Sequence, residues 1–223
     1  MRKFNLIIQD NHPIIKDGDN FILVDTGSPV TIHKDLNFSF NEQNHSVKTE
    51  YGGASIHKVA QYVQYPITTL LGTDIISGFK VLFDYKDGEI TFFEPNEPVE
   101  FNGALVPISS YSGIPVFEAT TEVGKIKFFL DSGAKLSYLN SELTTNMKRF
   151  GNDTDFHLSI GEYSTTTFES KIQINGSQLF CIFGTLPHQI ATLLNTIKGI
   201  MGSDFFFQRK ILLDISNSNM KII

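Results

Sequence analysis

The chain has 223 residues, of which 41% are hydrophobic and 19% are charged, and its formal net charge is −6. This composition is typical of a globular protein with one large or two small domains, and it excludes a disordered chain. No stretch is dense in lysine or arginine, so nucleic acid is not an expected partner, because phosphate binding requires a basic face.

The first ten residues contain a basic pair and a short apolar patch broken by Asn5, too short for the core of a signal peptide. No apolar run approaches membrane-spanning length. The one cysteine, Cys181, lies in L-F-C-I-F, where a buried side chain is expected rather than a reactive thiol. We therefore expect a soluble, cytoplasmic protein with no disulfide and no membrane partner.

Most of the chain is expected to form short strands, because brief β-rich runs alternate with Asp, Gly, Asn and Pro. These runs are residues 5–8, 13–15, 21–24, 81–85, 89–93, 105–108, 115–120, 127–130, 171–174 and 210–215. Helical signals are few: short helices are predicted over 73–80 and 203–210, capped by Thr73 and Ser203, and one over 188–198. The predicted fold class is therefore all-β with few short helices.

Two blocks of sequence occur twice in the same order. I-L-V-D-T-G-S at 22–28 matches F-F-L-D-S-G-A at 128–134, an offset of 106. L-L-G-T-D-I-I-S-G-F-K-V-L-F-D at 70–84 matches I-M-G-S-D-F-F-F-Q-R-K-I-L-L-D at 200–214, an offset of 130. The pairs indicate an internal duplication, with an insertion between the two blocks of the second half.

The predicted boundary between the halves is E-P-N-E-P at 94–98, a polar, proline-containing linker. Residues 1–98 then form an N-terminal lobe and residues 99–223 a C-terminal lobe with the insertion. We expect a cleft between two similar lobes. Because both copies of the repeated blocks lie in one chain, a monomer can contain a complete site.

Asp25 and Asp131 each follow three apolar residues in the first repeated block. Either residue alone is explained as a turn aspartate whose side chain bonds the backbone, but the repetition of both blocks favours a shared site. Two carboxyl groups facing each other share one proton, since neighbouring like charges cannot both ionise cheaply. One then acts as general base on a water while its protonated partner hydrogen-bonds a carbonyl.

The residues next to the aspartates suit this role. Gly27 and Gly133 permit a tight turn and a close approach of backbone amides to the carboxyl groups. The hydroxyl groups of Thr26 and Ser132 both donate and accept hydrogen bonds, so they can link the two half-sites across a pseudo-twofold axis.

These motifs resemble those of the pepsin/retropepsin-type aspartic proteases. In that family a hydrophobic-hydrophobic-Gly element supports the catalytic loop, and residues 70–72 and 200–202 match it. The spacing resembles two retropepsin-sized lobes fused in one chain. With 24 residues before Asp25, no propeptide is expected.

The segment E-Y-G-G-A-S at 50–55 resembles the flap of that family, a mobile hairpin that closes over bound peptide. The resemblance implies that Tyr51 is the flap tyrosine, with Gly52 and Gly53 at or near the tip. An ordinary exposed hairpin tyrosine is the alternative explanation. Residues 159–164 occupy roughly the equivalent place in the second half.

The resemblance implies an aspartic endopeptidase that uses Asp25 and Asp131 and needs no metal or cofactor. A peptide or protein substrate would lie extended in the inter-lobe cleft, paired with strand edges. The apolar neighbourhood suggests apolar side chains around the cut. The competing hypothesis is a peptide- or protein-binding module that keeps the fold without efficient catalysis. The six histidines show no metal-ligand spacing.

The two half-sites differ at one position. Ser28 is expected to hydrogen-bond the Asp25 carboxyl group, whereas Ala134 cannot do so for Asp131, which predicts an asymmetric pair. Four other aspartates repeat equally well, and we interpret them as structural residues that cap helices or end strands: Asp74, Asp84, Asp204 and Asp214.

Overall fold

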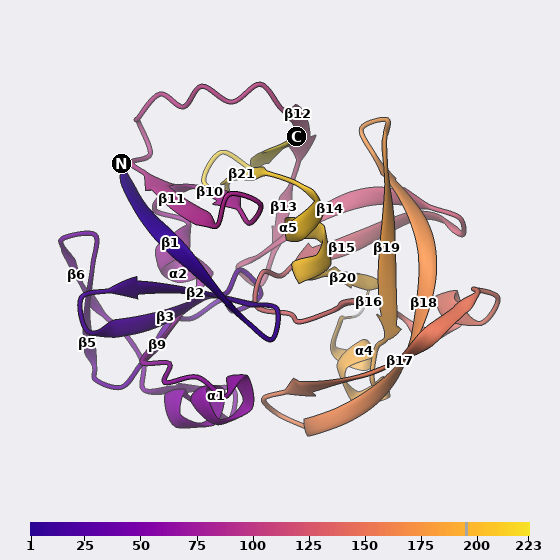
Figure 1. Ribbon diagram of the computed structural model, residues 1–223, viewed down its shortest axis with the longest axis horizontal. Helices are drawn as coiled ribbons and strands as arrows, with labels where there is room; N and C mark the ends of the chain where they lie inside the picture. Colours follow the sequence, from indigo (N-terminus) through magenta and orange to yellow (C-terminus); the bar gives the residue numbers. More distant parts are fainter. Residues whose placement is uncertain (195) are drawn as a thin grey trace.

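Strands dominate the computed structural model, which describes residues 1–194 and 196–223 (Figure 1). The first half contains β1 (Arg2–Gln9), β2 (His12–Asp17), β3 (Asn20–Val24), β4 (Ile32–His33), β5 (Asn37–Phe40), β6 (Gln43–Ser46), β7 (Glu50–Tyr51), β8 (Ala54–Ser55), β9 (Thr69–Leu71), β10 (Lys80–Asp84) and β11 (Glu89–Phe93). Its helices are α1 (Ile56–Val63) and α2 (Thr73–Ile76).

The second half contains β12 (Ala104–Pro107), β13 (Ser109–Tyr111), β14 (Ile114–Thr121), β15 (Gly124–Leu130), β16 (Ser137–Leu139), β17 (Arg149–His157), β18 (Gly161–Ile174), β19 (Ser177–Thr185), β20 (Gly199–Met201), β21 (Ile211–Asp214) and β22 (Asn219–Ile222). Its helices are α3 (Ser141–Thr144), α4 (His188–Leu194) and α5 (Ser203–Gln208). The prediction of an all-β fold with few short helices is therefore confirmed.

Two large sheets organise the strands. One has the order β12-β22-β21-β10-β11-β1-β2-β3-β9-β4, and the other has the order β13-β14-β15-β20-β16-β19-β18-β17. The first sheet joins the halves, because β10 pairs antiparallel with β21. Residues 94–103 contain neither helix nor strand and arch over the top of the molecule in Figure 1. The division into lobes at this segment stays a prediction.

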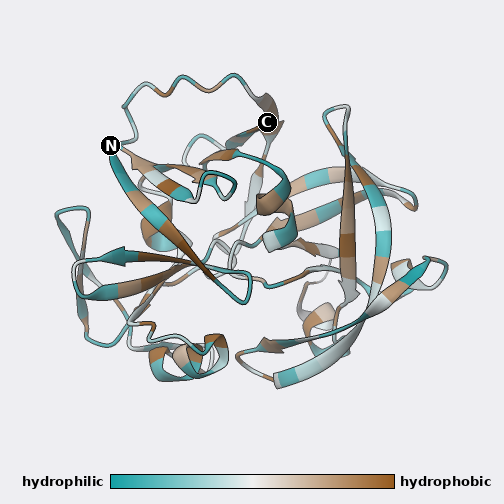
Figure 2. Cartoon of the chain, in the orientation of Figure 1, coloured by the Kyte–Doolittle hydropathy of each residue, from teal (hydrophilic) through white to brown (hydrophobic). Residues whose placement is uncertain are grey.

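A core of phenylalanines holds the two halves together. Figure 2 shows the apolar residues gathered on the strands, while the connecting loops are mostly polar. The largest buried cluster contains side chains from both halves, among them Phe83, Phe128 and Phe205. Cys181 belongs to this cluster, and burial raises the pKa of its thiol, so it is a packed core residue as predicted.

The repeated blocks build the same unit twice. β3 runs parallel to β9, and β15 runs parallel to β20. Such paired strands are covered on both faces, which explains the unbroken apolar runs before each aspartate. Asp25 donates its backbone N–H to Leu71 (3.0 Å), and Asp131 donates to Met201 (2.9 Å). Each aspartate is thereby fixed where two parallel strands end.

A hydroxyl group and a carboxylate support the loop in each half. In the first half, Thr31 donates its hydroxyl to Asp74 (2.6 Å) and accepts the N–H of Gly72 (2.9 Å). The Thr31 N–H also donates to Asp74. Asp74 is therefore a structural residue, as predicted, but the role of Thr31 was not predicted.

The second half repeats this arrangement with Ser137, whose hydroxyl donates to Asp204 and accepts the N–H of Gly202 (2.9 Å). At the far ends of the second blocks, Asp84 and Asp214 accept backbone N–H groups of the turns that follow β10 and β21. These aspartates end strands, as predicted.

The predicted caps of α2 and α5 are wrong by one residue. Gly72 and Gly202 are the N-caps, without a side-chain cap bond. Thr73 and Ser203 are the first helical residues instead, and their hydroxyl groups donate to the carbonyls of Ser28 (3.2 Å) and Lys135 (2.6 Å). The hydroxyl groups therefore tie the helices to the loops after the two aspartates.

The predicted helices are longer than the observed ones. α2 ends at Ile76 and α5 ends at Gln208, whereas the predictions ran to residues 80 and 210. α4 ends at Leu194, whereas the prediction ran to residue 198; Ile197 and Lys198 are not helical, and Asn195 lies outside the described residues. The helix α1 was not predicted. Ser55 caps its first turn, and Val59 and Val63 are buried one turn apart. No helix in residues 1–194 and 196–223 is long and apolar enough to cross a membrane.

The enclosure of Asp204 predicts a pH-dependent stability. Its Oδ2 atom is shielded from solvent, and burial raises its pKa from 3.8 to about 6. Between these two pH values, Asp204 is therefore protonated in the folded state and ionised in the unfolded chain. This stabilisation is complete below about pH 4 and is lost as the pH rises through about 6, an effect of up to about 3 kcal/mol.

We expect Asp204→Asn to remove this dependence. The free energy of unfolding, measured by urea denaturation at pH 4 and at pH 7, should shift in favour of the variant by up to about 3 kcal/mol between the two pH values. Parallel pH profiles for the two proteins would contradict the assignment. Asp19→Asn, at an exposed turn, is the matched control.

Candidate active site

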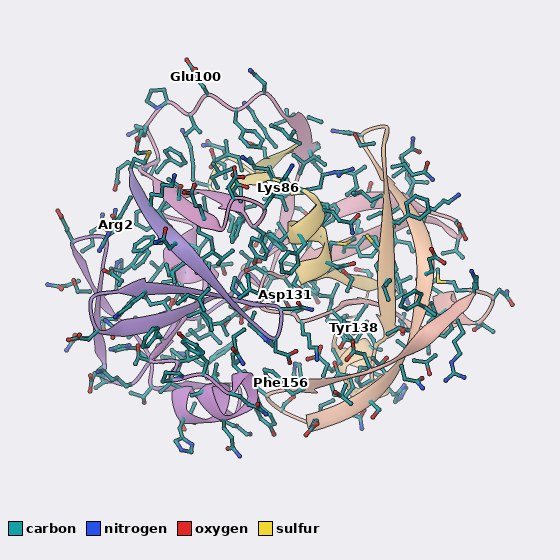
Figure 3. All side chains as sticks on the ribbon, in the orientation of Figure 1. Arg2, Lys86, Glu100, Asp131, Tyr138 and Phe156 are labelled. Carbon is teal, nitrogen blue, oxygen red and sulfur yellow. The ribbon has the colours of Figure 1, made fainter. Side chains whose placement is uncertain are left out.

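The structure brings Asp25 and Asp131 side by side at the centre of the molecule; Figure 3 labels Asp131 between the two halves. The carboxyl groups are close enough to share a hydrogen bond. Each lies against the glycine of the opposite half-site. A Cβ atom at Gly27 would collide with the Asp131 carboxyl group, and one at Gly133 would collide with that of Asp25. Only glycine therefore fits at these two positions.

Backbone amides orient each carboxyl group in the same way. The residues two and three positions after the aspartate donate their N–H groups to its Oδ1 atom. For Asp25 the donors are Gly27 (2.8 Å) and Ser28 (3.1 Å), and for Asp131 they are Gly133 (3.0 Å) and Ala134 (3.1 Å).

The prediction that the Ser28 hydroxyl group bonds Asp25 is wrong. That hydroxyl donates to the carbonyl of Val30 at 2.8 Å and so closes the turn after the aspartate. Only the N–H of Ser28 reaches the carboxyl group, and Ala134 supplies an equivalent N–H to Asp131. The difference between serine and alanine therefore does not reach the carboxyl pair in this structure.

Thr26 and Ser132 link the half-sites through four reciprocal hydrogen bonds. The Thr26 hydroxyl donates to the Leu130 carbonyl (2.7 Å) and accepts the N–H of Ser132 (2.9 Å). The Ser132 hydroxyl donates to the Val24 carbonyl (2.7 Å) and accepts the N–H of Thr26 (3.0 Å). Both side chains are fully buried. This network crosses the pseudo-twofold axis directly beneath the two aspartates.

The surroundings favour retention of a proton by the carboxyl pair. Burial raises the pKa of both Asp25 and Asp131, and the charge of Asp25 raises that of Asp131 further. The backbone N–H groups act in the opposite direction, because they stabilise the ionised form. The pair therefore titrates as a unit, with one proton held between two carboxyl groups.

Above the pair lies a cavity of about 290 Å³ lined by both halves. Tyr51 and Gly52 line it from the β7–β8 hairpin, whose turn uses positive φ values at Gly52 (57°) and Gly53 (81°). Gly53 itself does not line the cavity. Tyr51 remains 41% exposed, and its role as a flap residue stays a prediction.

The opposite wall comes from the hairpin of β17 and β18. Residues 159–164 form the tip of this hairpin and the start of β18, and Ser159 and Tyr163 line the cavity. The ring of Phe156 stacks on Tyr62 of α1, with centroids 4.7 Å apart and planes inclined by 7°. Figure 1 shows α1 and the hairpin end meeting at the lower edge of the molecule.

Lys58 connects the two hairpins that border the cavity. Its ammonium group donates to the Gly53 carbonyl (3.2 Å) at the tip of the first hairpin and to the Leu158 carbonyl (2.9 Å) of the second. A second link between the halves is the ion pair of Lys135 with Asp10 (3.1 Å). Neither contact could be predicted from the sequence, because both join segments far apart in the chain.

The predicted absence of a metal is not a matter that this structure tests. Within the described part of the chain, no group of three or more His, Cys, Asp or Glu residues is arranged to hold a metal ion. The polar groups that line the cavity include carboxyl groups, tyrosine hydroxyls and the side chains of His12, His157 and Lys135. Such groups suit proton transfer and hydrogen bonding to a bound peptide.

The chain has the bilobal fold of the pepsin/retropepsin-type aspartic proteases, as predicted. It is similar to the aspartic proteinase from Irpex lacteus, with a TM-score of 0.57, 11% identity, and 99% of this chain and 96% of that chain covered. The retropepsin-like aspartic protease from Rickettsia conorii matches with a TM-score of 0.39, 14% identity and coverage of 55% and 96%. The EIAV protease complexed with the inhibitor HBY-793 matches with a TM-score of 0.34, 16% identity and coverage of 49% and 93%. No protein-family model and no curated protein matches the sequence.

The network beneath the aspartates predicts a stability loss for Thr26→Val. This change keeps the shape of the side chain and removes its hydroxyl, which leaves the Leu130 carbonyl and the Ser132 N–H without a partner. We expect the free energy of unfolding to fall by about 1–3 kcal/mol in urea denaturation. The control is Thr120→Val on an exposed position of β14, where a change within about 0.5 kcal/mol is expected. Equal effects of the two substitutions would contradict this role.

The bridge made by Lys58 predicts local opening in Lys58→Met. Methionine keeps an apolar stem but cannot bond the Gly53 and Leu158 carbonyls. Hydrogen exchange measured by mass spectrometry should become about tenfold faster in residues 50–55 and 157–161, while exchange in the core stays unchanged. Lys34→Met, at an exposed position, is the control. Unchanged exchange in both hairpins would show that the bridge does not restrain them.

Proposed function

We propose that this protein is an aspartic endopeptidase that hydrolyses peptide bonds with a water activated by Asp25 and Asp131. The observation that carries the proposal is the juxtaposition of the two carboxyl groups, which are held by equivalent hydrogen bonds from backbone amides and whose pKa values burial raises. The ionised member takes a proton from the water as general base. The protonated member donates a hydrogen bond to the substrate carbonyl, whose oxygen gains negative charge as the water adds.

The cavity above the pair supports a peptide as substrate. Its lining combines apolar side chains, such as Leu23 and Ile190, with the two carboxyl groups. An extended peptide needs both kinds of contact, because alternate side chains fill pockets while the backbone forms hydrogen bonds. Tyr51 and the glycines of the β7–β8 hairpin are proposed to cover the bound peptide. Since one chain supplies both aspartates, we propose that a monomer acts alone, in the cytoplasm.

The test is cleavage of a diverse peptide pool across about pH 3 to 7, read by mass spectrometry. We expect cleavage by the parent protein, and a fall in kcat/KM of about 10²–10⁴-fold in Asp25→Asn, because that residue is one half of the general acid–base pair. Asp131→Asn should lose a comparable amount. Asp19→Asn, which changes an exposed aspartate in the β2–β3 turn, should cleave as the parent does.

The competing function is a peptide- or protein-binding module with this fold. In that case the parent and Asp25→Asn would bind the same peptides, and neither would cleave them. Circular dichroism of each variant would establish that lost cleavage reflects lost chemistry and not unfolding.

A further inference from the structure

A third carboxyl group faces the cavity from the second half. Asp155, on β17, is buried and lines the same cavity as Asp25 and Asp131. Its carboxylate accepts the hydroxyl of Tyr138 and the N–H of Phe156 (2.7 Å). No motif marks this residue in the sequence, and the dyad chemistry does not use it.

Two tyrosines extend the polar group at Asp155 further along the cavity wall. Tyr163 donates its hydroxyl to the hydroxyl of Tyr138 at 3.0 Å, and Tyr138 in turn donates to Asp155. Both tyrosines line the cavity. Figure 3 labels Tyr138 on the second half of the chain. The chain of donors ends on a carboxylate, so the cluster carries negative charge and exposes a hydroxyl oxygen that can still accept a hydrogen bond.

The nearest cation does not neutralise this charge by direct contact. Lys135 directs its ammonium group to Asp10 (3.1 Å), to Asp153 (3.5 Å) and to the Thr154 carbonyl (3.0 Å). The histidines that line the cavity are His12 and His157, and burial lowers the pKa of each, which favours their neutral forms. The described lining of the cavity is therefore acidic. It includes three carboxyl groups, whereas its lysine, Lys135, is already paired with Asp10 and Asp153.

Apolar side chains lie beside the polar cluster. Leu186 and Ile190 are buried with Tyr138 in one cluster, Ile200 packs against it, and all of them line the cavity. A lysine or arginine side chain has matching chemistry: a flexible apolar stem that packs on hydrocarbon, and a cationic head that seeks a carboxylate and hydroxyl oxygens.

We propose that the wall formed by Asp155, Tyr138 and Tyr163 is a subsite for a basic side chain of the bound peptide. Asp155 contacts the cationic head and Tyr163 accepts a hydrogen bond from it, while the apolar wall holds the stem. This inference rests on the proposed function, since it names a substrate class for the same cleft. It also replaces the expectation of purely apolar side chains around the cut with one basic position.

The preference should depend on pH, because the cation is attracted only to the ionised carboxylate. Burial raises the pKa of Asp155 from 3.8 to about 6. The groups facing it are Tyr138 and Tyr163, whose pKa values burial raises, and the ion pair of Lys135 with Asp10. Asp155 gains its negative charge as the pH rises through about 6, so the preference for a basic residue should increase over that range.

The experiment uses matched peptides that differ at a single position, occupied by lysine, arginine, norleucine or glutamate. In the cleavage arm, kcat/KM at pH 7 should favour lysine or arginine over norleucine by tenfold or more in the parent. In Asp155→Asn this ratio should fall about tenfold, because asparagine lacks the negative charge that attracts the cation. Asparagine can still accept the Tyr138 hydroxyl, so the wall stays intact.

A binding arm separates this inference from the proposed function. Fluorescence anisotropy of the same peptides on Asp25→Asn should show the basic preference, and the double variant Asp25→Asn/Asp155→Asn should lose it. Charge-dependent binding without cleavage by the parent would overturn the endopeptidase and leave the subsite standing.

Cleavage with the same preference in parent and Asp155→Asn would overturn the subsite and leave the endopeptidase standing. Absence of both binding and cleavage would overturn both. Asp19→Asn, which changes an exposed aspartate in the β2–β3 turn outside the cavity lining, is the control and should keep the parent preference.

Discussion

Two carboxyl groups held against each other are the constraint on which the rest of the structure depends. Like charges at this separation repel, so the arrangement persists only where the fold holds it from several sides. The Thr26 and Ser132 hydroxyls bond the backbone of the opposite half, and each half's glycine leaves room for the other half's carboxyl group. The halves cannot separate without exposing these buried hydroxyl groups. The site and the contact between the halves are therefore one structure.

The pseudo-symmetry is closest where the carboxyl groups are held and weakest around the cavity. Thr31 and Ser137 occupy equivalent positions, with the same glycine and aspartate partners. The cavity walls differ. The first half contributes α1 and the short hairpin of β7 and β8, whose strands have two residues each, whereas the second half contributes the long hairpin of β17 and β18. Equivalent support suits a paired acid–base group. Unequal walls suit a peptide, because its two ends are not related by symmetry.

Sequence reasoning predicted what is local and repeated. The aspartates, their glycines and the strands before them lie in contiguous blocks, so pattern and chemistry appear together. Thr31 and Ser137 were missed because each is a single hydroxyl residue outside the blocks. α1 was missed although Ser55 forms its cap and Val59 and Val63 form a buried face, because the helix is only eight residues long and directly follows the flap motif at 50–55. Asp155 reaches the cavity only because β17 folds beside it. No local pattern in the sequence predicts this long-range placement.

The surroundings of the carboxyl pair differ in these walls. Ser28 and Ala134 each supply one N–H at 3.1 Å, so the residue after Asp-X-Gly leaves the two sides equivalent. The first-half wall contains no acid besides Asp25, whereas the second-half wall adds Asp155 next to the tyrosines. An ionised Asp155 opposes further negative charge in the cavity and so favours retention of the shared proton. A cation bound there would relieve that effect, so the proposed recognition of a basic side chain would be linked to the protonation of the carboxyl pair.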